Sequence, residues 1–356
     1  MRAVRFLAGI LVLLVALTAG ASAAEPELRR GINITGWFRF PASRDPAALN
    51  RYLSDHAMAG LRRAGFDFVR LAVDPAVVAD PATLIAQIRR VQRHGLAVVV
   101  SPHPAGWQLE SVPADRAELL AFWRRMAHAL RPLDPRLTVP EVLNEPVFPG
   151  AAAGWAALQR AVLAVIRAEL PNNLVVVTGN DWGSVAGLLA LAPLADHNLR
   201  YSFHLYDPAE LTSLAAYRPG LDRAALARLP FPVGEASGCH VVTTGQADPP
   251  TRLLMRFYCD QGWDAARVAD RVAAASAWAT RNGVTLLAGE FGASAALNAP
   301  ARMAWLRTVR AACEAHGIGW ALWGYDDIMG FALPRPPPED PRLDPGVLAA
   351  LGLSPG

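Results

Sequence analysis

Short apolar segments typical of strands alternate along this chain with segments typical of helices, and there are eight strand candidates. The strand candidates are rich in Val, Leu, Ile and Phe and lack a strict alternation of apolar and polar residues. That composition is expected of parallel strands that are buried on both faces. They cover residues 31–36, 66–73, 96–101, 139–144, 174–178, 200–205, 285–289 and 319–323.

The helical patterns lie between these strand candidates, at residues 47–63, 81–94, 115–130, 155–170, 264–281 and 302–316. Glycine follows four of them, at Gly65, Gly95, Gly283 and Gly317, where a left-handed C-terminal cap favours this residue. Eight strands alternating with helices predict an α/β fold of the (β/α)₈ TIM-barrel type. A doubly wound sheet is the alternative, but no GxGxxG motif follows the first strand candidate.

No long linker or change of composition divides the chain, so we expect one domain over residues 24–356. Its irregular part is a long insertion after the sixth strand, residues 208–262, which we expect to form a wall over one end of a cleft. The insertion contains Cys239 and Cys259, and in an exported protein we expect them to form a disulfide. Two separately buried thiols are the alternative. Cys313 lies in a helical pattern and is expected to be a small buried apolar residue.

The first residues have the pattern of a secretory signal peptide. Arg2 and Arg5 precede an apolar run over residues 6–17, and Ala21, Ser22 and Ala23 supply small residues at the spacing of a cleavage site. We therefore expect residues 1–23 to be removed and the mature protein to be secreted or periplasmic. The alternative is an uncleaved membrane anchor, because residues 6–24 carry no charge.

Charge and motif content argue against several function classes. The formal charge of +3 falls to +1 without Arg2 and Arg5, and the basic residues, all arginine, form no cluster. A nucleic-acid partner is therefore not expected. The sequence has no C-x-x-C pair, histidine cluster, P-loop or G-x-S-x-G motif. We expect a monomer that needs neither a metal ion nor a cofactor.

Two glutamates occur at the ends of strand candidates. The stretch from Val139 to Leu143 is mainly apolar, and Asn144, Glu145 and Pro146 follow it. Because proline cannot donate to a strand ladder, it places Asn144 and Glu145 at the carboxyl end of the strand. Glu290 likewise follows an apolar strand candidate and precedes a turn glycine. The carboxyl ends of barrel strands meet on one face, so the two glutamates predict a two-carboxylate site.

The other strand ends carry polar or aromatic residues as well. Any one of them alone would be an ordinary core or loop residue, but together they match the needs of a sugar-cleaving site. Two carboxyl groups act on the glycosidic bond, aromatic rings stack on sugar faces, and polar side chains bind the hydroxyls. The candidates for sugar binding are Arg70, His103, Asn144, His204, Tyr206, Trp323, Trp37, Trp107 and Trp182.

The order Arg70, His103, Asn144-Glu145-Pro146, His204-x-Tyr206, Glu290 and Trp323 resembles glycoside hydrolase family 5, the cellulase family of clan A, from residue 31 to 323. The resemblance implies that Glu145 is the general acid/base and Glu290 the nucleophile of a retaining mechanism. It also implies that Asn144 binds the sugar 2-hydroxyl, that Tyr206 and Arg70 support Glu290, and that His204 lies near Glu145. Trp323 would form the floor beneath the sugar, and His103 would bind its hydroxyls.

These observations predict a secreted retaining β-glycosidase acting on a β-glucan-type polysaccharide, with an endo-β-1,4-glucanase as the first choice. A mannanase, a β-1,3- or β-1,6-glucanase, an exo-glucosidase and a transglycosylase remain open, because the linkage depends on the loops. From another class, a catalytically silent carbohydrate-binding barrel is the alternative. A further alternative is a membrane-anchored enzyme that acts on a polysaccharide during its export.

Overall fold

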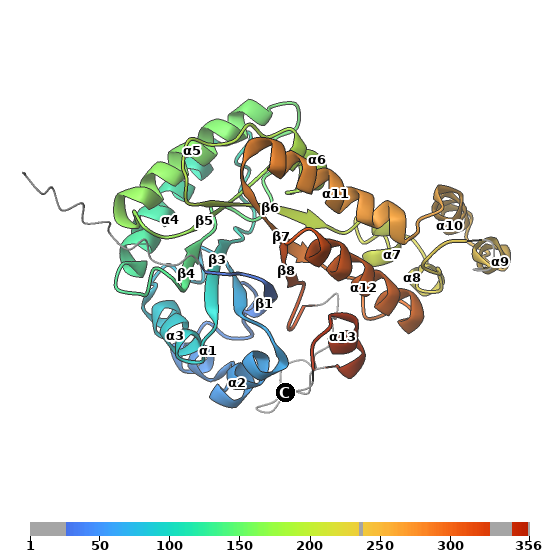
Figure 1. Ribbon diagram of the computed structural model, residues 1–356, viewed down its shortest axis with the longest axis horizontal. Coiled ribbons are helices and arrows are strands. Elements are labelled where there is room, and N and C mark those ends of the chain that lie inside the picture. Colours follow the sequence, from blue (N-terminus) through green and yellow to red (C-terminus); the bar gives the residue numbers. More distant parts are fainter. Residues whose placement is uncertain (1–25, 235–237, 328–343, 355–356) are drawn as a thin grey trace, which may run out of the picture.

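The computed structural model describes residues 26–234, 238–327 and 344–354. Its eight parallel strands form one sheet in the order β4-β3-β2-β1-β8-β7-β6-β5, and helices surround this sheet (Figure 1). The two ends of that order, β4 and β5, meet through an isolated bridge between Glu141 and Val176. The sheet therefore curls into a nearly closed α/β barrel, and the predicted single-domain TIM-barrel fold is confirmed.

The strands agree closely with the predicted ones, except that the fourth is shorter. They are β1 Arg30–Phe38, β2 Phe68–Val73, β3 Ala97–Pro102, β4 Thr138–Pro140, β5 Val175–Thr178, β6 Leu199–Leu205, β7 Thr285–Phe291 and β8 Gly319–Leu322. Regular pairing of β4 with β3 ends at the pair of Val100 with Pro140. Because proline has no N–H to continue a ladder, Glu141 to Glu145 follow the strand instead of belonging to it.

The helices up to β6 are α1 Pro46–Arg51, α2 Asp55–Ala64, α3 Ala82–Arg93, α4 Pro113–Leu130, α5 Ala152–Glu169 and α6 Val185–Leu189. After the insertion come α11 Ala265–Asn282, α12 Ala299–Ala315 and α13 Pro345–Ala350. The single helix predicted at 47–63 is two helices, because Ser54 caps α2 by accepting a hydrogen bond from the N–H of Ala57. Gly65 and Gly283 cap α2 and α11 in the left-handed conformation, as predicted.

Side chains of the strands alternate between the barrel interior and the layer beneath the helices. In β3, Val98 and Val100 belong to the large cluster that includes the helices, whereas Val99 belongs to a small cluster made mainly by strand residues. Phe68 fills this interior, where a Cβ at the paired position Gly31 would collide with its ring. The same period of two carries the inner face of β2 from Phe68 to Arg70, toward the carboxyl ends of the strands.

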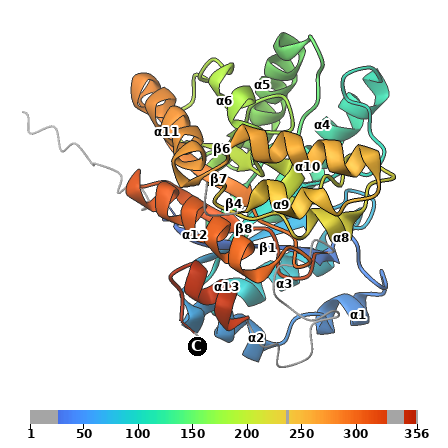
Figure 2. The same ribbon diagram turned by 90° about the vertical axis from the view of Figure 1, so that its right-hand side faces the viewer.

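The insertion after β6 has structure of its own: α7 Ala209–Thr212, α8 Arg223–Leu226, α9 Cys239–Thr244 and α10 Pro249–Gln261. A disulfide joins Cys239 to Cys259, with their Cα atoms 5.7 Å apart, so this prediction is confirmed. Cys313 is a buried free thiol. In Figure 1, α9 and α10 lie to the right of α11 and α12, away from the strands, and Figure 2 shows them from that side. This position does not support the expected wall over the cleft.

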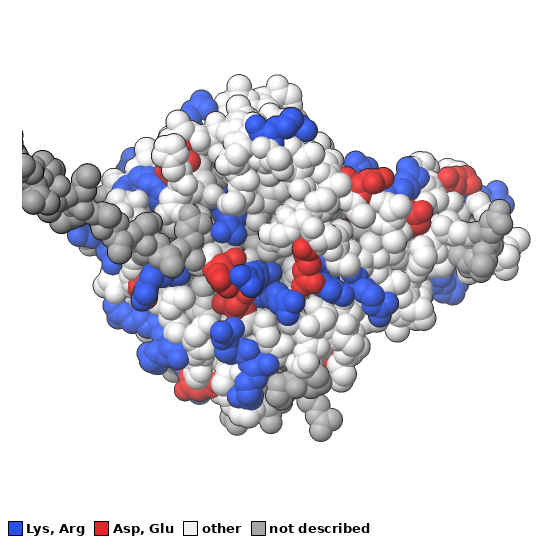
Figure 3. All heavy atoms as spheres, in the orientation of Figure 1, with Lys and Arg blue, Asp and Glu red and all other residues white. Residues whose placement is uncertain are grey.

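Within the described residues, no helix is long and apolar enough to cross a membrane. The predicted signal peptide, residues 1–23, lies outside the described residues and stays a prediction. On the face of the molecule seen in Figure 3, acidic and basic side chains are interspersed among uncharged surface.

Candidate active site

The two predicted glutamates lie together at the carboxyl ends of the strands. Glu145 follows β4, Glu290 belongs to β7, and His204 of β6 lies between them. Nδ1 of His204 is 2.8 Å from Oε1 of Glu145 and 3.5 Å from Oε2 of Glu290. One oxygen of each carboxylate and a ring nitrogen of His204 all lie within 4.8 Å of one another.

A β-bulge directs Glu290 into the site. Phe203 pairs with Ala288 but His204 pairs with Glu290, so Gly289 is the extra residue of β7. A bulge of this kind shifts the following side chains to the other face of the strand. Only glycine fits here, because a Cβ at position 289 would collide with Oγ of Ser202. The bulge explains why Glu290 lies on the inner face although Leu287, three residues earlier, also packs inside the barrel.

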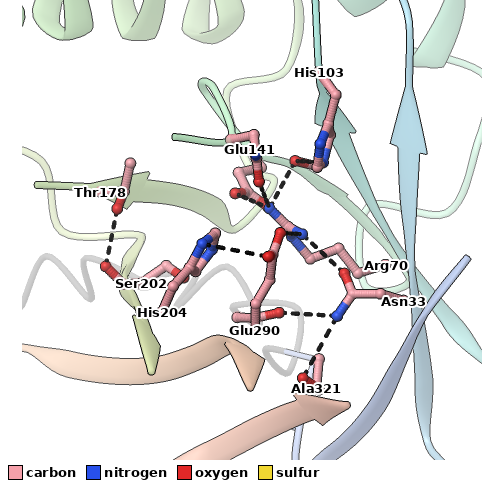
Figure 4. Close-up of polar contacts among 12 residues, drawn as sticks. Asn33, Arg70, His103, Glu141, Thr178, Ser202, His204, Glu290 and Ala321 are labelled. Atoms are coloured by element: carbon pink, nitrogen blue, oxygen red, sulfur yellow. Dashed lines mark hydrogen bonds and ion pairs between the residues drawn. The ribbon is translucent and has the colours of Figure 1, made fainter. Parts of the chain in front are cut away.

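Arg70 is fully buried at the centre of the site and connects four strands or strand ends (Figure 4). Burial alone would lower the pKa of its guanidinium, but the charges of Glu141 and Glu290 outweigh this effect and raise that pKa. Arg70 is therefore a permanent cation and a donor only. Its hydrogen bonds reach Glu141 (2.6 and 2.7 Å), Glu290 (2.5 Å), Asn33 (2.8 Å), Asn144 (2.8 Å) and Ser101 (2.9 Å).

Two further donors surround the carboxylates. The hydroxyl of Tyr206 donates to Oε2 of Glu290 at 2.9 Å. Burial first, and then the charges of Glu290 and Glu145, raise the pKa of Tyr206 well above 10, so this phenol keeps its proton. Burial acts to lower the pKa of His204, but the charge of Glu290 and the hydrogen bond to Glu145 outweigh it and raise that pKa. Both side chains therefore favour negative charge at this point.

His103 and Trp323 form the side of the site next to β8. Their rings lie nearly parallel, at an interplanar angle of 24° and with centroids 5.9 Å apart. His103 is buried, and burial, followed by the charges of Arg39, Arg70 and His204, holds its pKa well below 6.5. It is therefore neutral. The guanidinium carbon of Arg39 lies 5.9 Å from the Trp323 ring centroid.

A cavity of about 390 Å³ opens beside Glu145, within the size range of small-molecule sites. Its lining includes Arg39, His103, Trp107, Asn144, Glu145 and Trp182. Trp182 is 60% exposed and presents a flat apolar ring to solvent. None of the described residues in this lining belongs to the insertion 208–262.

Trp37, which we expected to line the cleft, lies inside the core instead. Its side chain is completely buried, its indole N–H donates to the carbonyl oxygen of Leu49, and its ring stacks on Tyr52. It offers no face to a sugar. The reason lies in β1, which continues to Phe38 and carries Trp37 beneath α1 instead of ending before it.

Three residues of the site, Glu141, Ser101 and Arg39, were not predicted from the sequence. A signal for Glu141 was present, because it lies two residues after Val139, an inner-face residue of the barrel. A carboxylate that continues an inward-facing apolar pattern must find a buried cation. Ser101 could have been found in the same way, two residues before His103. Arg39 lies beyond the end of β1, where the alternation of side chains along a strand no longer predicts which way a side chain points.

Glu145, His204 and Glu290 also approach closely enough to hold a metal ion. Both oxygens of Glu290 already accept hydrogen bonds, however, from Arg70 and Tyr206. A carboxylate with both oxygens engaged by fixed donors suits covalent or electrostatic chemistry better than metal coordination. The geometry is that of two carboxyl groups facing one reacting centre.

Comparison with known proteins gives concordant matches. The family model described as Cellulase (glycosyl hydrolase family 5) matches residues 29–327. Endoglucanase C of Acetivibrio thermocellus is 22% identical over 320 residues, which cover 84% of this chain and 91% of that protein. Endoglucanase 3 of Fibrobacter succinogenes is 27% identical over 221 residues, 60% of this chain, but the match spans 32% of that relative. The crystal structure of Thermotoga maritima Cel5A in complex with cellobiose, a mutant form, superimposes with a TM-score of 0.73 at 20% identity, covering 92% of this chain and 99% of that one.

Proposed function

Because the chain belongs to glycosyl hydrolase family 5, it is a glycoside hydrolase, and we propose that it is a retaining endo-β-1,4-glucanase. Two relatives that carry the name endoglucanase support the choice of a β-glucan and of internal cleavage. The observation that carries the proposal is the pair formed by Glu145 and Glu290, two carboxylates with different partners on one face of the barrel.

In the proposed mechanism Glu290 is the nucleophile. Its carboxylate attacks the anomeric carbon, the glycosidic bond breaks, and a covalent glycosyl-enzyme forms. The donors Arg70 and Tyr206 keep Glu290 in place and favour its charged form. In the second step water attacks the same carbon and releases Glu290, so the anomeric configuration is retained.

Glu145 is the proposed general acid and base. It gives a proton to the departing glycosidic oxygen in the first step and takes one from water in the second. Its hydrogen bond to Nδ1 of His204 orients the carboxyl group. The approach of Glu145 to Glu290, with oxygens within 4.8 Å, supports retention, because retaining enzymes hold their carboxyl groups at about 5–5.5 Å and inverting ones at about 6.5–9.5 Å.

The remaining site residues are proposed to bind sugar. Asn144, held by Arg70 through its side-chain oxygen, directs its amide group toward the 2-hydroxyl at the cleavage point. His103 and Trp323 bind the same sugar, while Trp107 and Trp182 extend the contact along the cleft. We propose that its partner is a polysaccharide and that it acts as a monomer.

The test combines variants with product analysis. Wild-type protein, Glu290→Ala and Glu145→Ala are assayed on cello-, laminari-, manno- and gentio-oligosaccharides. We expect cleavage of internal cello-oligosaccharide bonds by the wild type and almost none by either variant. Azide should restore turnover to Glu290→Ala with inverted products. Wild-type turnover in that variant would overturn the nucleophile assignment, and sugar binding without turnover in the wild type would indicate a silent barrel.

We also propose that residues 1–23 direct export and are then removed, so that the enzyme acts in the periplasm or outside the cell. The charged start, apolar run and small-residue site support this proposal. Determining the N-terminal residue of protein recovered from the native host tests it. An intact Met1 in a membrane fraction would indicate the anchored enzyme instead.

A further inference from the structure

Glu141 is a buried carboxylate to which the proposed mechanism gives no role. It follows β4 directly, its side chain is completely buried, and it is not among the residues that line the described cavity. Both of its oxygens accept hydrogen bonds from Arg70, one from Nε at 2.6 Å and one from Nη2 at 2.7 Å. Figure 4 shows Glu141 on one side of Arg70 and Glu290 on the other. Arg70 therefore lies between Glu141 and the proposed nucleophile.

The pairing fixes the orientation of the guanidinium. A carboxylate that accepts from two nitrogens of one arginine defines the plane in which the other donors lie. Nη1 donates to Asn33 and Glu290, and Nη2, which also donates to Glu141, lies within hydrogen-bond distance of Asn144 and Ser101. Two proposed site residues, Asn144 and Glu290, thus depend on how Glu141 holds Arg70.

The pairing also decides how much positive charge Glu290 experiences. Arg70 serves two buried carboxylates at once, Glu141 and Glu290. Among the described residues, the other titratable or charged groups near Glu290 are His204 of β6, Tyr206 after it, Glu145 after β4 and Arg39 after β1. Asp327, buried after β8, interacts electrostatically with Tyr206 and Arg39. Glu141 offsets one unit of positive charge in this set.

We propose that Glu141 is a positioning residue that holds Arg70 in place and offsets its charge, so that Glu290 stays reactive as a nucleophile. The inference rests on the proposed function of Glu290. A carboxylate facing an arginine of its own is strongly stabilised in its charged form and attacks carbon less readily. A carboxylate that shares the arginine with Glu141 is held in position with less of this stabilisation.

Replacing Glu141 by glutamine keeps its size and removes its charge. Arg70 then faces Glu290 alone, and Glu290 binds a proton less readily. The acid side of the kcat/KM profile, which reports the free enzyme's essential carboxylate, should move to lower pH by roughly one pH unit. On the plateau, kcat should fall by at least about tenfold. Glu141→Asp keeps the charge and should leave the acid side where it is in the wild type, even if kcat falls.

Asp196→Asn is the matched control. Asp196 accepts from Nε and Nη2 of Arg167 at 2.7 and 3.1 Å, the same two-point pairing outside the site. The Asp196→Asn variant should leave the pH profile of kcat/KM unchanged, even if it lowers the stability of the fold. The profiles are measured on an aryl β-cellobioside after each variant has been shown to be folded by circular dichroism. An acid side that is the same in Glu141→Gln and wild type, or one that Glu141→Asp moves equally, overturns the proposal.

A second measurement separates this inference from the proposed function. Glutamate labelled with ¹³C at the side-chain carboxyl allows titration of Glu290 by NMR, with the signal assigned from Glu290→Gln. The Glu290 signal should titrate at lower pH in Glu141→Gln than in the wild type. This readout needs no turnover, so an unchanged titration overturns the role of Glu141 even if the proposed substrate is wrong. A shifted titration in a protein without glucanase activity supports Glu141 and rejects the proposed substrate.

Discussion

The hydroxyl of Tyr206 donates to Oε2 of Glu290 at 2.9 Å, while Nη1 of Arg70 donates to Oε1 of the same carboxylate at 2.5 Å. Each oxygen of Glu290 thus has its own donor, from opposite sides of the barrel. Two donors hold the carboxylate more firmly than one, because rotation about its last bond would break both hydrogen bonds. The neutral donor Tyr206 and the charged residues around Glu290 can therefore be tested separately.

Tyr206→Phe removes the neutral donor without changing the charge of the site. Hydrogen bonds to charged groups contribute about 1.5–3 kcal/mol, so kcat/KM should fall by about 10- to 100-fold. Because the pKa of Tyr206 is raised well above 10, the phenol keeps its proton throughout the working range. On the plateau of the profile, above its acid side, the loss should therefore be the same at every pH, as measured on an aryl β-cellobioside.

The matched control is Tyr217→Phe. Tyr217 donates to Oε1 of Glu210 at 3.0 Å and is 62% exposed. The Tyr217 variant loses a hydrogen bond to a carboxylate at the surface, where such bonds contribute little, and should keep wild-type kinetics. A Tyr206→Phe enzyme with wild-type kcat/KM would show that Arg70 alone is sufficient for Glu290.

His204 should make stability depend on pH. The pKa of His204 is raised above its usual 6.5 in the folded protein, so the folded state binds this proton more tightly than the unfolded one. The resulting stabilisation is fully present below pH 6.5 and is lost as the pH rises through the folded-state pKa. The difference in Tm between wild type and His204→Gln should be larger at about pH 5 than at about pH 8.

His240→Gln is the control for that measurement. His240 is exposed, and its Nε2 lies 3.5 Å from Asp260 at the surface, so this variant should follow the wild type at both pH values. A His204→Gln deficit that grows toward alkaline pH would contradict the sign of the argument.

The disulfide should stabilise the fold. Cys239 and Cys259 are 20 residues apart, and closing a loop of that size removes about 3 kcal/mol of unfolded-state entropy. Cys239→Ala should lower the unfolding free energy by up to about this amount, and adding Cys259→Ala should change little, because the bridge is already lost. Urea unfolding measures both, and non-reducing peptide mapping checks the bridge itself.

The insertion that carries this disulfide should not influence products. Since α9 and α10 lie away from the strands (Figure 1), breaking the bridge should leave the product pattern on long glucans unchanged. A change from internal to terminal cleavage in the Cys239→Ala enzyme would restore the predicted wall.

Trp182 and Trp37 should respond in opposite ways to substitution. Trp182→Ala removes an exposed ring at the cavity and should weaken cello-oligosaccharide binding by about 1–2 kcal/mol. Trp37→Phe alters a buried core ring and should lower stability while affinity stays the same. Calorimetric titration in an inactive Glu290→Gln background measures both affinities. Equal affinity of the Trp182 variant and the wild type would remove this ring from the sugar path.

Much of the fold was predictable because each strand is a short, mainly apolar run that is followed within two residues by a glycine, a proline or a charged residue. The barrel then brings strand ends together whatever the loops do, and so Arg70, Glu145, His204 and Glu290 meet as predicted. The position of Trp37 was predicted wrongly because the direction of its side chain depends on where β1 ends. A shift of one residue along a strand moves a side chain to the other face of the sheet. The bulge at Gly289 could not be predicted either, because the extra residue becomes evident only from the pairing of β7 with β6.

The isolated bridge between Glu141 and Val176 joins β4 to β5, the two ends of the strand order. A cut in the chain between these two strands would give two half-barrels. The first half, β1 to β4, supplies Arg70, Glu141 and Glu145, and the second, β5 to β8, supplies His204 and Glu290. Neither half owns both carboxylates. Expressed as separate fragments cut between β4 and β5, the halves would be inactive alone, and turnover would report their reassembly. Activity from the proposed catalytic pair would thus report that the barrel has closed, with Arg70 connecting the carboxylates of both fragments.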